Sequence, residues 1–194
     1  MTTIAVVKKG GYVPIAADTM TKWGSGKESA AYIANSDKIV KVGTTLLAGS
    51  GSATFKTIMR DYFSRPRVAP KFDDPIAIFR TWQRFHVTLK EDYFLNPSSE
   101  KDDSLESSRF DVLLANPRGI FGIGAHRTVQ EYSKFYAIGS GTDIALGALY
   151  ATYQDPDRDA LSLARLAVEA AAEFDDATGL PVIAHKIRLS GRSR

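Results

Sequence analysis

The first eighteen residues, MTTIAVVKKGGYVPIAAD (1–18), contain two strand-like runs on either side of a glycine turn. The runs before and after Lys8-Lys9-Gly10-Gly11 are rich in β-branched and apolar side chains, which is typical of a β-hairpin. With the turn centred near its first glycine, facing residue numbers sum to about twenty, so Thr2 lies beside Asp18. A register shifted by one residue places Thr3 there instead. Asp18 then either starts a loop or is held beside the chain terminus for chemistry.

Composition places the chain among ordinary globular domains. Its 194 residues are 44% hydrophobic and 24% charged. The excess of 25 Lys and Arg over 22 Asp and Glu is too small to indicate a nucleic-acid partner. The lack of cysteine excludes disulfide scaffolds, thiol nucleophiles and cysteine zinc sites. No apolar run reaches membrane-spanning length and no signal-peptide pattern is present, so we expect a cytoplasmic protein without a membrane partner.

The expected elements come in groups: two strand pairs, two helices, three strands, two helices and a last strand. Such grouping indicates an α+β fold with antiparallel sheets, and the helix pairs indicate a four-layer αββα sandwich. The expected strands are 3–7, 12–17, 38–42, 45–48, 110–115, 120–123, 131–138 and 180–187. The expected helices run from the Gly49-Ser50-Gly51-Ser52 segment to Phe63, from Asp73-Asp74-Pro75 through Leu89, from Thr142 to Gln154, and from Asp159 to Phe174.

One domain is expected over 1–194, with the polar and mostly acidic stretch 96–108 as a mobile surface insertion. Residues 18–27 are expected to form a polar loop. Apolar side chains recur at helical spacing after Asp73-Asp74-Pro75 and are predicted to face the core. They are Ile76, Phe79, Trp82, Phe85 and Leu89.

Two charged segments break local rules. Strand alternation places one of Lys38 and Lys41 among apolar neighbours, where burial would change its pKa. That lysine either influences a nucleophile or extends its ammonium group to water. Asp175-Asp176 ends a predicted helix, where the helix dipole disfavours acids, so the pair is either a solvated turn or a functional one.

Two Gly-Ser-Gly segments, 49–51 and 139–141, each follow a strand and precede a helix. Both would place backbone N–H groups where an anion or oxyanion binds, although neither has the spacing of a nucleotide loop. The three histidines His86, His126 and His185 have no ligand spacing and no carboxylate companion in the sequence. We therefore expect no metal and no cofactor.

Six segments, in this order, resemble the proteasome β-subunit family, including bacterial homologues that work with a separate unfoldase. The resemblance covers essentially the whole chain. Each segment alone is a weak signal, whereas the six segments in this order are specific for the family. The segments are Thr2-Thr3-Ile4-Ala5-Val6, Val13-Pro14-Ile15-Ala16-Ala17-Asp18, Lys38-Ile39-Val40-Lys41-Val42, Gly49-Ser50-Gly51-Ser52-Ala53, Ala137-Ile138-Gly139-Ser140-Gly141 and Asp175-Asp176-Ala177-Thr178-Gly179.

The resemblance implies an N-terminal nucleophile hydrolase, here a threonine endopeptidase. Thr2 would be the nucleophile after removal of Met1, with Asp18 and Lys38 beside it. Gly51 would supply the oxyanion N–H, with Gly49 as the alternative. Ser140, Asp175 and Thr178 would complete the network around the threonine amine; the family has serine at the last of these positions. While Met1 is attached, that amine is absent and the chain should be inactive.

The resemblance also suggests a substrate pocket and an assembly. The expected pocket residues are Met20, Thr21, Ser36, Val40, Gly49 and Ala53. The expected assembly is two stacked rings of six or seven identical chains, acting on peptides or unfolded proteins, with a separate ATP-dependent unfoldase as partner. Two alternatives stay open: a catalytically silent ring that serves as a scaffold, and a small-molecule amidase of the same nucleophile class.

Overall fold

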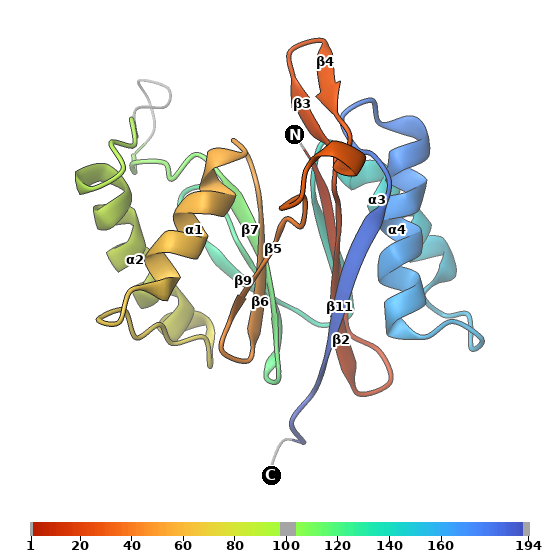
Figure 1. Ribbon diagram of the computed structural model, residues 1–194. Coiled ribbons are helices and arrows are strands. Elements are labelled where there is room, and N and C mark those ends of the chain that lie inside the picture. Colours follow the sequence, from red (N-terminus) through yellow and green to blue (C-terminus); the bar gives the residue numbers. More distant parts are fainter. Residues whose placement is uncertain (1, 98–103, 192–194) are drawn as a thin grey trace.

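The computed structural model describes residues 2–97 and 104–191, and its elements form four layers (Figure 1). One sheet has the strand order β10-β1-β2-β11 and the other β5-β6-β7-β8-β9. Helices α1 and α2 cover the outer face of the five-stranded sheet, and α3 and α4 cover the four-stranded one. This confirms the predicted αββα sandwich.

The sandwich contains most of the chain. The strands are β1 Thr3–Val7, β2 Tyr12–Asp18, β5 Ile39–Val42, β6 Thr45–Ser50, β7 Asp111–Asn116, β8 Gly119–Ile123, β9 Val129–Tyr132, β10 Phe135–Gly139 and β11 Val182–Arg188. The helices are α1 Thr54–Ser64, α2 Pro75–Glu91, α3 Thr142–Thr152 and α4 Ala160–Phe174. Every pairing within the two large sheets is antiparallel.

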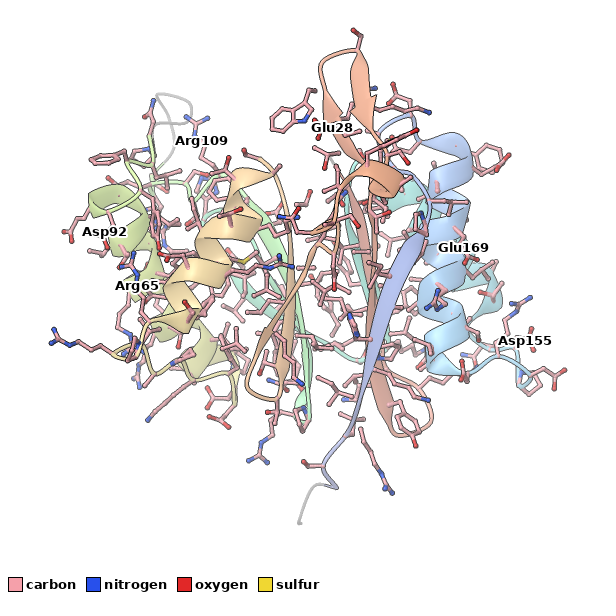
Figure 2. All side chains as sticks on the ribbon, in the orientation of Figure 1. Glu28, Arg65, Asp92, Arg109, Asp155 and Glu169 are labelled. Atoms are coloured by element: carbon pink, nitrogen blue, oxygen red, sulfur yellow. The ribbon has the colours of Figure 1, made fainter. Side chains whose placement is uncertain are left out.

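Three apolar layers hold the sandwich together. Ile4, Val6 and Ile15 lie between the two sheets, while Ala5, Val7 and Ala16 alternate with them and face α3 and α4. The third layer packs α1 and α2 on the five-stranded sheet. Strand alternation thus buries both faces of β1, which explains its continuous apolar run. Charged side chains such as Glu28, Asp92 and Glu169 are exposed on the outside (Figure 2).

Two expected segments have different structures from those predicted. Residues 131–138 form parts of two strands rather than one, because the chain turns at Ser133-Lys134 and passes from the five-stranded to the four-stranded sheet. The expected loop 18–27 contains most of a separate hairpin, β3 Thr21–Trp23 and β4 Gly26–Glu28, which is followed by a 3-10 turn, Ala30–Tyr32. Gly24 takes a positive φ of 56° in that hairpin turn.

The buried face of α2 is also partly different from the prediction. Asp74 caps this helix as expected, accepting bonds from Ile76 N and Ala77 N at 2.9 Å each. Ile76 is 59% exposed, however, because 3.6 residues per turn places it about 180° around the helix from the buried Phe85. Phe79 is 39% exposed as well. The residues buried on this helix are Ile78, Thr81, Trp82, Phe85, His86 and Leu89.

Part of the predicted mobile insertion 96–108 is anchored to the core, while residues 98–103 lie outside the described residues. Ser108 is fully buried and its Oγ lies 2.9 Å from His86 Nδ1. The other ring nitrogen of His86 lies 3.2 Å from the Glu106 carboxylate. Burial lowers the pKa of this histidine, and the Glu106 bond opposes that effect. His86 thus has a carboxylate neighbour that lies twenty residues away in the sequence.

Candidate active site

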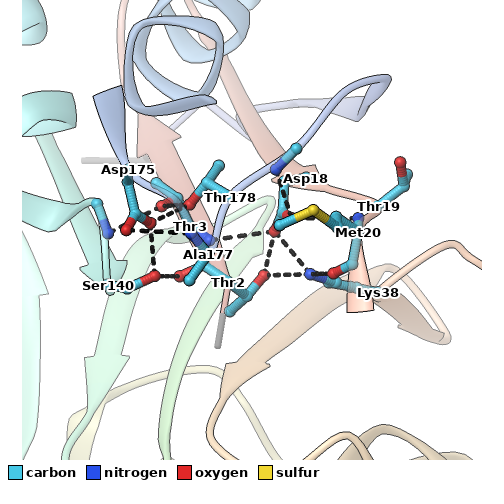
Figure 3. A network of polar contacts seen from close by, with 12 residues as sticks. Thr2, Thr3, Asp18, Thr19, Met20, Lys38, Ser140, Asp175, Ala177 and Thr178 are labelled. Atoms are coloured by element: carbon cyan, nitrogen blue, oxygen red, sulfur yellow. Dashed lines mark hydrogen bonds and ion pairs between the residues drawn. The ribbon is translucent and has the colours of Figure 1, made fainter. Parts of the chain in front are cut away.

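The hairpin β1–β2 brings Thr2 and Asp18 together, and a hydrogen bond joins their side chains (Figure 3). Ile4 faces Ala17, so facing numbers sum to 21 and Thr3 continues the register opposite Asp18. The shifted alternative is therefore the observed one. Thr2 still contacts the acid, because its hydroxyl donates to Asp18 Oδ1 from just beyond the strand end. Gly10 and Gly11, with φ of 60° and 80°, make the connecting turn.

Asp18 is fully buried, and the described residues supply hydrogen bonds to both of its oxygens. Oδ1 accepts from the Thr2 hydroxyl, from Thr3 N at 3.1 Å and from Lys38 Nζ at 2.7 Å. Oδ2 accepts from the backbone N–H groups of Met20 and Gly179, both at 3.2 Å. A buried carboxylate with this many donors is held in one fixed orientation.

Lys38 is the more buried member of the Lys38/Lys41 pair, with a side chain 13% exposed, and Lys41 is exposed. Lys38 Nζ donates to three oxygens: Thr2 Oγ1 at 2.8 Å, Asp18 Oδ1 at 2.7 Å and the Met20 carbonyl at 2.6 Å. Burial lowers the pKa of Lys38, and the Asp18 carboxylate partly counteracts this. The ammonium group touches the Thr2 hydroxyl, where it favours a negative charge on that oxygen.

A second network connects β1 to the turn after α4. Asp175 Oδ2 lies 2.6 Å from Ser140 Oγ and 2.5 Å from Thr178 Oγ1. Burial alone would raise the pKa of the Asp175 carboxyl, but hydrogen bonds from Ser140, Thr178 and Ala177 N hold it below its ordinary value. This explains why an acid ends α4 against the helix dipole: its partners are hydroxyl donors.

Thr3 belongs to this network and was not singled out from the sequence. Because the Asp175 carboxylate only accepts, Thr178 donates to it, and Thr3 donates in turn to Thr178 Oγ1 over 2.6 Å. Thr3 Oγ1 then accepts from Gly141 N at 3.1 Å. The signal was available, since strand alternation sends consecutive threonines to opposite faces of β1.

The two Gly-Ser-Gly segments differ in structure. In the second, Ser140 N donates to the Thr2 carbonyl at 2.9 Å and Gly141 N donates to Thr3, so these N–H groups serve the hairpin rather than an anion. The expected anion role of this segment was therefore wrong. Gly139 must be a glycine, because a Cβ there would lie 1.9 Å from the Thr2 carbonyl oxygen. In the first segment, Gly49 and Gly51 line a cavity next to Thr2.

That cavity has a volume of about 120 Å³ and contains four of the six predicted pocket residues: Met20, Thr21, Gly49 and Ala53. Val40 is not among the lining residues, because it is 4% exposed and packs beneath α1 and α2. Ser36 does not line the cavity either. Four lining residues were missed: Lys22, Trp23, Ser52 and Lys56. Lys56 follows Ala53 by three residues, so helical spacing could have identified it.

No site for a metal ion was expected from the sequence. Within residues 2–97 and 104–191, no group of three or more His, Asp or Glu side chains is placed to hold one. In the same part of the chain, no helix combines the length and apolar character needed to cross a membrane.

No protein-family model and no curated protein matches the chain. Two solved structures of BPH, a bacterial proteasome homologue from Thiobacillus denitrificans, are each 56% identical in sequence and each is covered completely. The structure in complex with epoxomicin has a TM-score of 0.92 and covers 97% of this chain. The other has a TM-score of 0.93 and covers 98%. Trypanosoma brucei HslV, 20% identical with a TM-score of 0.65, shares the fold over 96% of this chain and 99% of its own.

Proposed function

Because the chain belongs to the proteasome β-subunit family, with the bacterial proteasome homologues, we propose that it is a threonine endopeptidase. Its nucleophile is the Thr2 hydroxyl once Met1 has been removed. One observation carries the proposal: the buried Thr2 and Asp18 and the partly buried Lys38 form a hydrogen-bonded cluster at the edge of a cavity. The Thiobacillus denitrificans homologue has been solved in complex with epoxomicin, so we propose epoxomicin as a probe of Thr2 in this chain.

Removal of Met1 gives Thr2 a free amine, whose ordinary pKa is about 8. The neutral amine takes the hydroxyl proton while Oγ1 attacks a peptide carbonyl carbon. The tetrahedral intermediate collapses, the C–N bond breaks, and the amine proton passes to the leaving amino group. A water molecule then attacks the ester in the same way, which releases the acid and restores the threonine. Lys38 stabilises the developing charge on Oγ1, and Asp18 holds Lys38 in place.

We assign the oxyanion site to the N–H group of Gly51, with Gly49 as the alternative. Gly51 lines the cavity with Thr2 and has a φ of +154°, which a side chain would rarely adopt. Ser140, Asp175 and Thr178 fix the orientation of the Thr2 backbone, because Ser140 binds both Asp175 and the Thr2 carbonyl. These residues position the amine rather than touch the substrate.

We further propose that identical chains assemble in the cytoplasm into two stacked rings of six or seven, which enclose the sites and admit peptides or unfolded chains. A separate ATP-dependent unfoldase would deliver folded substrates. Large exposed apolar side chains on three helices support an assembled state: Ile76 on α2, Tyr150 on α3 and Phe174 on α4 are 59%, 85% and 78% exposed.

Hydrolysis of fluorogenic peptides by matched variants tests the peptidase proposal. Thr2→Ala should lose hydrolysis completely, whereas Thr2→Ser should retain part of it because serine keeps the hydroxyl and the amine. Size-exclusion mass and the melting temperature serve as controls for assembly and folding. Full hydrolysis by Thr2→Ala would exclude Thr2 as nucleophile. A folded ring of processed chains that cleaves no peptide would instead support the scaffold alternative. A monomer or dimer that hydrolyses small amides but not peptides would support the amidase alternative.

A further inference from the structure

The charged side chains that line the cavity next to Thr2 are all positive among the described residues. Among the described residues, three lysines line it, Lys22, Lys38 and Lys56, and no Asp or Glu does. In the proposed reaction, a peptide attacked by Thr2 would place the side chain on the acyl side of the scissile bond next to this cavity, because Thr2 itself lines it. The charge of the lining therefore bears on which side chain the site accepts.

Two of the three lysines have carboxylate partners outside the cavity. Lys38 pairs with Asp18 at 2.7 Å and has two further acceptors, so its three N–H bonds are all used. Lys22 pairs with Asp176 at 2.5 Å. The charge of these two lysines is thus largely compensated within the chain.

Lys56 has no carboxylate within ion-pair distance among the described residues. Its Nζ donates to a neutral oxygen, the Asn35 carbonyl, at 2.7 Å. One turn along α1, Arg60 likewise donates to a backbone carbonyl, that of Asp37, at 2.9 Å. The Asp37 carboxylate is engaged elsewhere, with Ile39 N at 2.8 Å and His185 Nε2 at 3.3 Å.

The pKa of Lys56 reflects this lack of compensation. Burial lowers it first, the positive charges of Arg60 and Lys38 lower it further, and the attraction of Asp37 is the weakest of the four effects. An added carboxylate in the cavity would supply the missing negative charge, and two donor positions of the ammonium group have no acceptor among the described residues.

On the basis of the proposed peptidase function, we infer that the site selects peptides with an acidic residue on the acyl side of the scissile bond. The carboxylate of Asp or Glu enters the cavity and pairs with Lys56, while the carbonyl of the same residue meets the Thr2 hydroxyl. Lys56 is thereby the residue that determines specificity, and it takes no part in the bond-breaking steps.

Fluorogenic peptide pairs that differ by charge at one position test this inference. Chains without Met1 are assayed with Asp against Asn, and with Glu against Gln, at the position before the reporter group. The pairs have nearly equal size, so the ratio of kcat/KM isolates the charge. We expect a ratio of about ten or more in favour of the acid, as for one partly desolvated charged hydrogen bond. A ratio of one or less overturns the inference.

Lys56→Gln keeps a donor and removes the charge, and Lys41→Gln removes a charge from an exposed position of β5 as a matched control. The acid-to-amide ratio of kcat/KM should fall to near one in Lys56→Gln and should stay unaltered in Lys41→Gln. An unchanged ratio in Lys56→Gln overturns the role of Lys56.

Epoxomicin labelling separates this inference from the function on which it rests. A chain labelled on Thr2 that cleaves neutral but not acidic peptides overturns the inference and leaves the peptidase proposal standing. A processed chain that is neither labelled nor able to cleave any peptide of the set overturns both.

Discussion

Thr2 contacts the carboxylate of Asp18 and the ammonium group of Lys38, which come from different parts of the chain. Asp18 ends β2, Lys38 immediately precedes β5, and the short register of the first hairpin brings the acid to the threonine. The three residues depend on one another, because Asp18 accepts a hydrogen bond from Lys38 and Lys38 donates one to the Thr2 hydroxyl. Removal of one member therefore affects both stability and chemistry.

Lys38→Ala is expected to lower kcat/KM by about 10²- to 10³-fold, because the nucleophile loses its cation. It should also lower the free energy of unfolding by about 3–5 kcal/mol, since the fully buried Asp18 is left without its charge partner. Peptide hydrolysis and urea unfolding measure the two effects. Lys41→Ala, on the exposed side of the same segment, should change neither by much. Equal losses of kcat/KM and of stability in the two variants would contradict the role of Lys38 beside the Thr2 hydroxyl.

Asp175 gives a prediction for the pH dependence of stability. Its pKa in the folded chain is below the ordinary value of 3.8, so its stabilising effect is present above that value and is lost as the pH falls through the folded-state pKa. Asp175→Asn should therefore lower the free energy of unfolding by about 1 kcal/mol at neutral pH. The difference from the unsubstituted chain should shrink below pH 3.8, as measured by urea unfolding.

The neighbouring Asp176 is the matched control for that measurement. Its side chain is 83% exposed and pairs with Lys22 on the surface. Asp176→Asn should change stability by less than about 0.5 kcal/mol. A larger loss in Asp176→Asn than in Asp175→Asn would show that the hydroxyl bonds to Asp175 do not stabilise this turn.

At the scale of elements, Gly51, which immediately follows β6, forms part of the wall of the cavity. A Cβ at this position would lie 2.9 Å from Phe110 Cβ and 3.3 Å from the Arg109 carbonyl oxygen, and the φ of +154° adds strain. Gly51→Ala should cost about 1–3 kcal/mol of stability and should also reduce hydrolysis, because the wall beside Thr2 shifts. Thermal unfolding and peptide hydrolysis provide the readouts.

Gly147 provides the opposite case within α3. Apart from its chain neighbours and the backbone of its own helix, a Cβ there has no atom within 4 Å, so Gly147→Ala should stabilise the chain by about 0.5–1 kcal/mol and leave hydrolysis unchanged. Destabilisation by both substitutions would indicate that the backbone conformation at Gly51 is not what makes that position sensitive.

The sequence predicted the positions of the helices and strands better than the tertiary contacts that these elements make. Helix caps such as Asp74 and apolar runs such as β1 depend on neighbours in the chain, so the four helices and most of the strands were correctly located. The outward position of Ile76 and the contact of His86 with Glu106 depend on how α2 packs against distant segments, which local spacing does not determine. The exit of β9 from one sheet into β10 of the other was missed for the same reason.

Within the candidate site, the order of motifs identified Thr2, Asp18 and Lys38, which the structure brings together. Thr3 was named only as the alternative neighbour of Asp18, and its place in the hydrogen-bond network with Thr178 was missed. Lys56 was missed because the expected pocket was taken from family positions rather than from the helix face that follows Ala53. Val40 was placed in the pocket although it faces the core beneath α1.

For the whole molecule, the proposed assembly predicts a defined mass. Native mass spectrometry should give a particle of twelve or fourteen identical chains, and electron microscopy should show two stacked rings with sixfold or sevenfold symmetry. The exposed apolar side chains on the outer helices would be covered in such a particle. A stable monomer or dimer at micromolar concentration would contradict the ring and would favour the amidase alternative.

The central claim is that Thr2 becomes the N-terminal nucleophile, and the intact mass of the purified chain before and after incubation with epoxomicin tests it most directly. The account predicts a chain that lacks Met1, gains the mass of one inhibitor, and carries it on the peptide that begins with Thr2; Thr2→Ala should gain none. A preparation that hydrolyses peptides while every chain retains Met1, or a labelled Thr2→Ala chain, would contradict the claim.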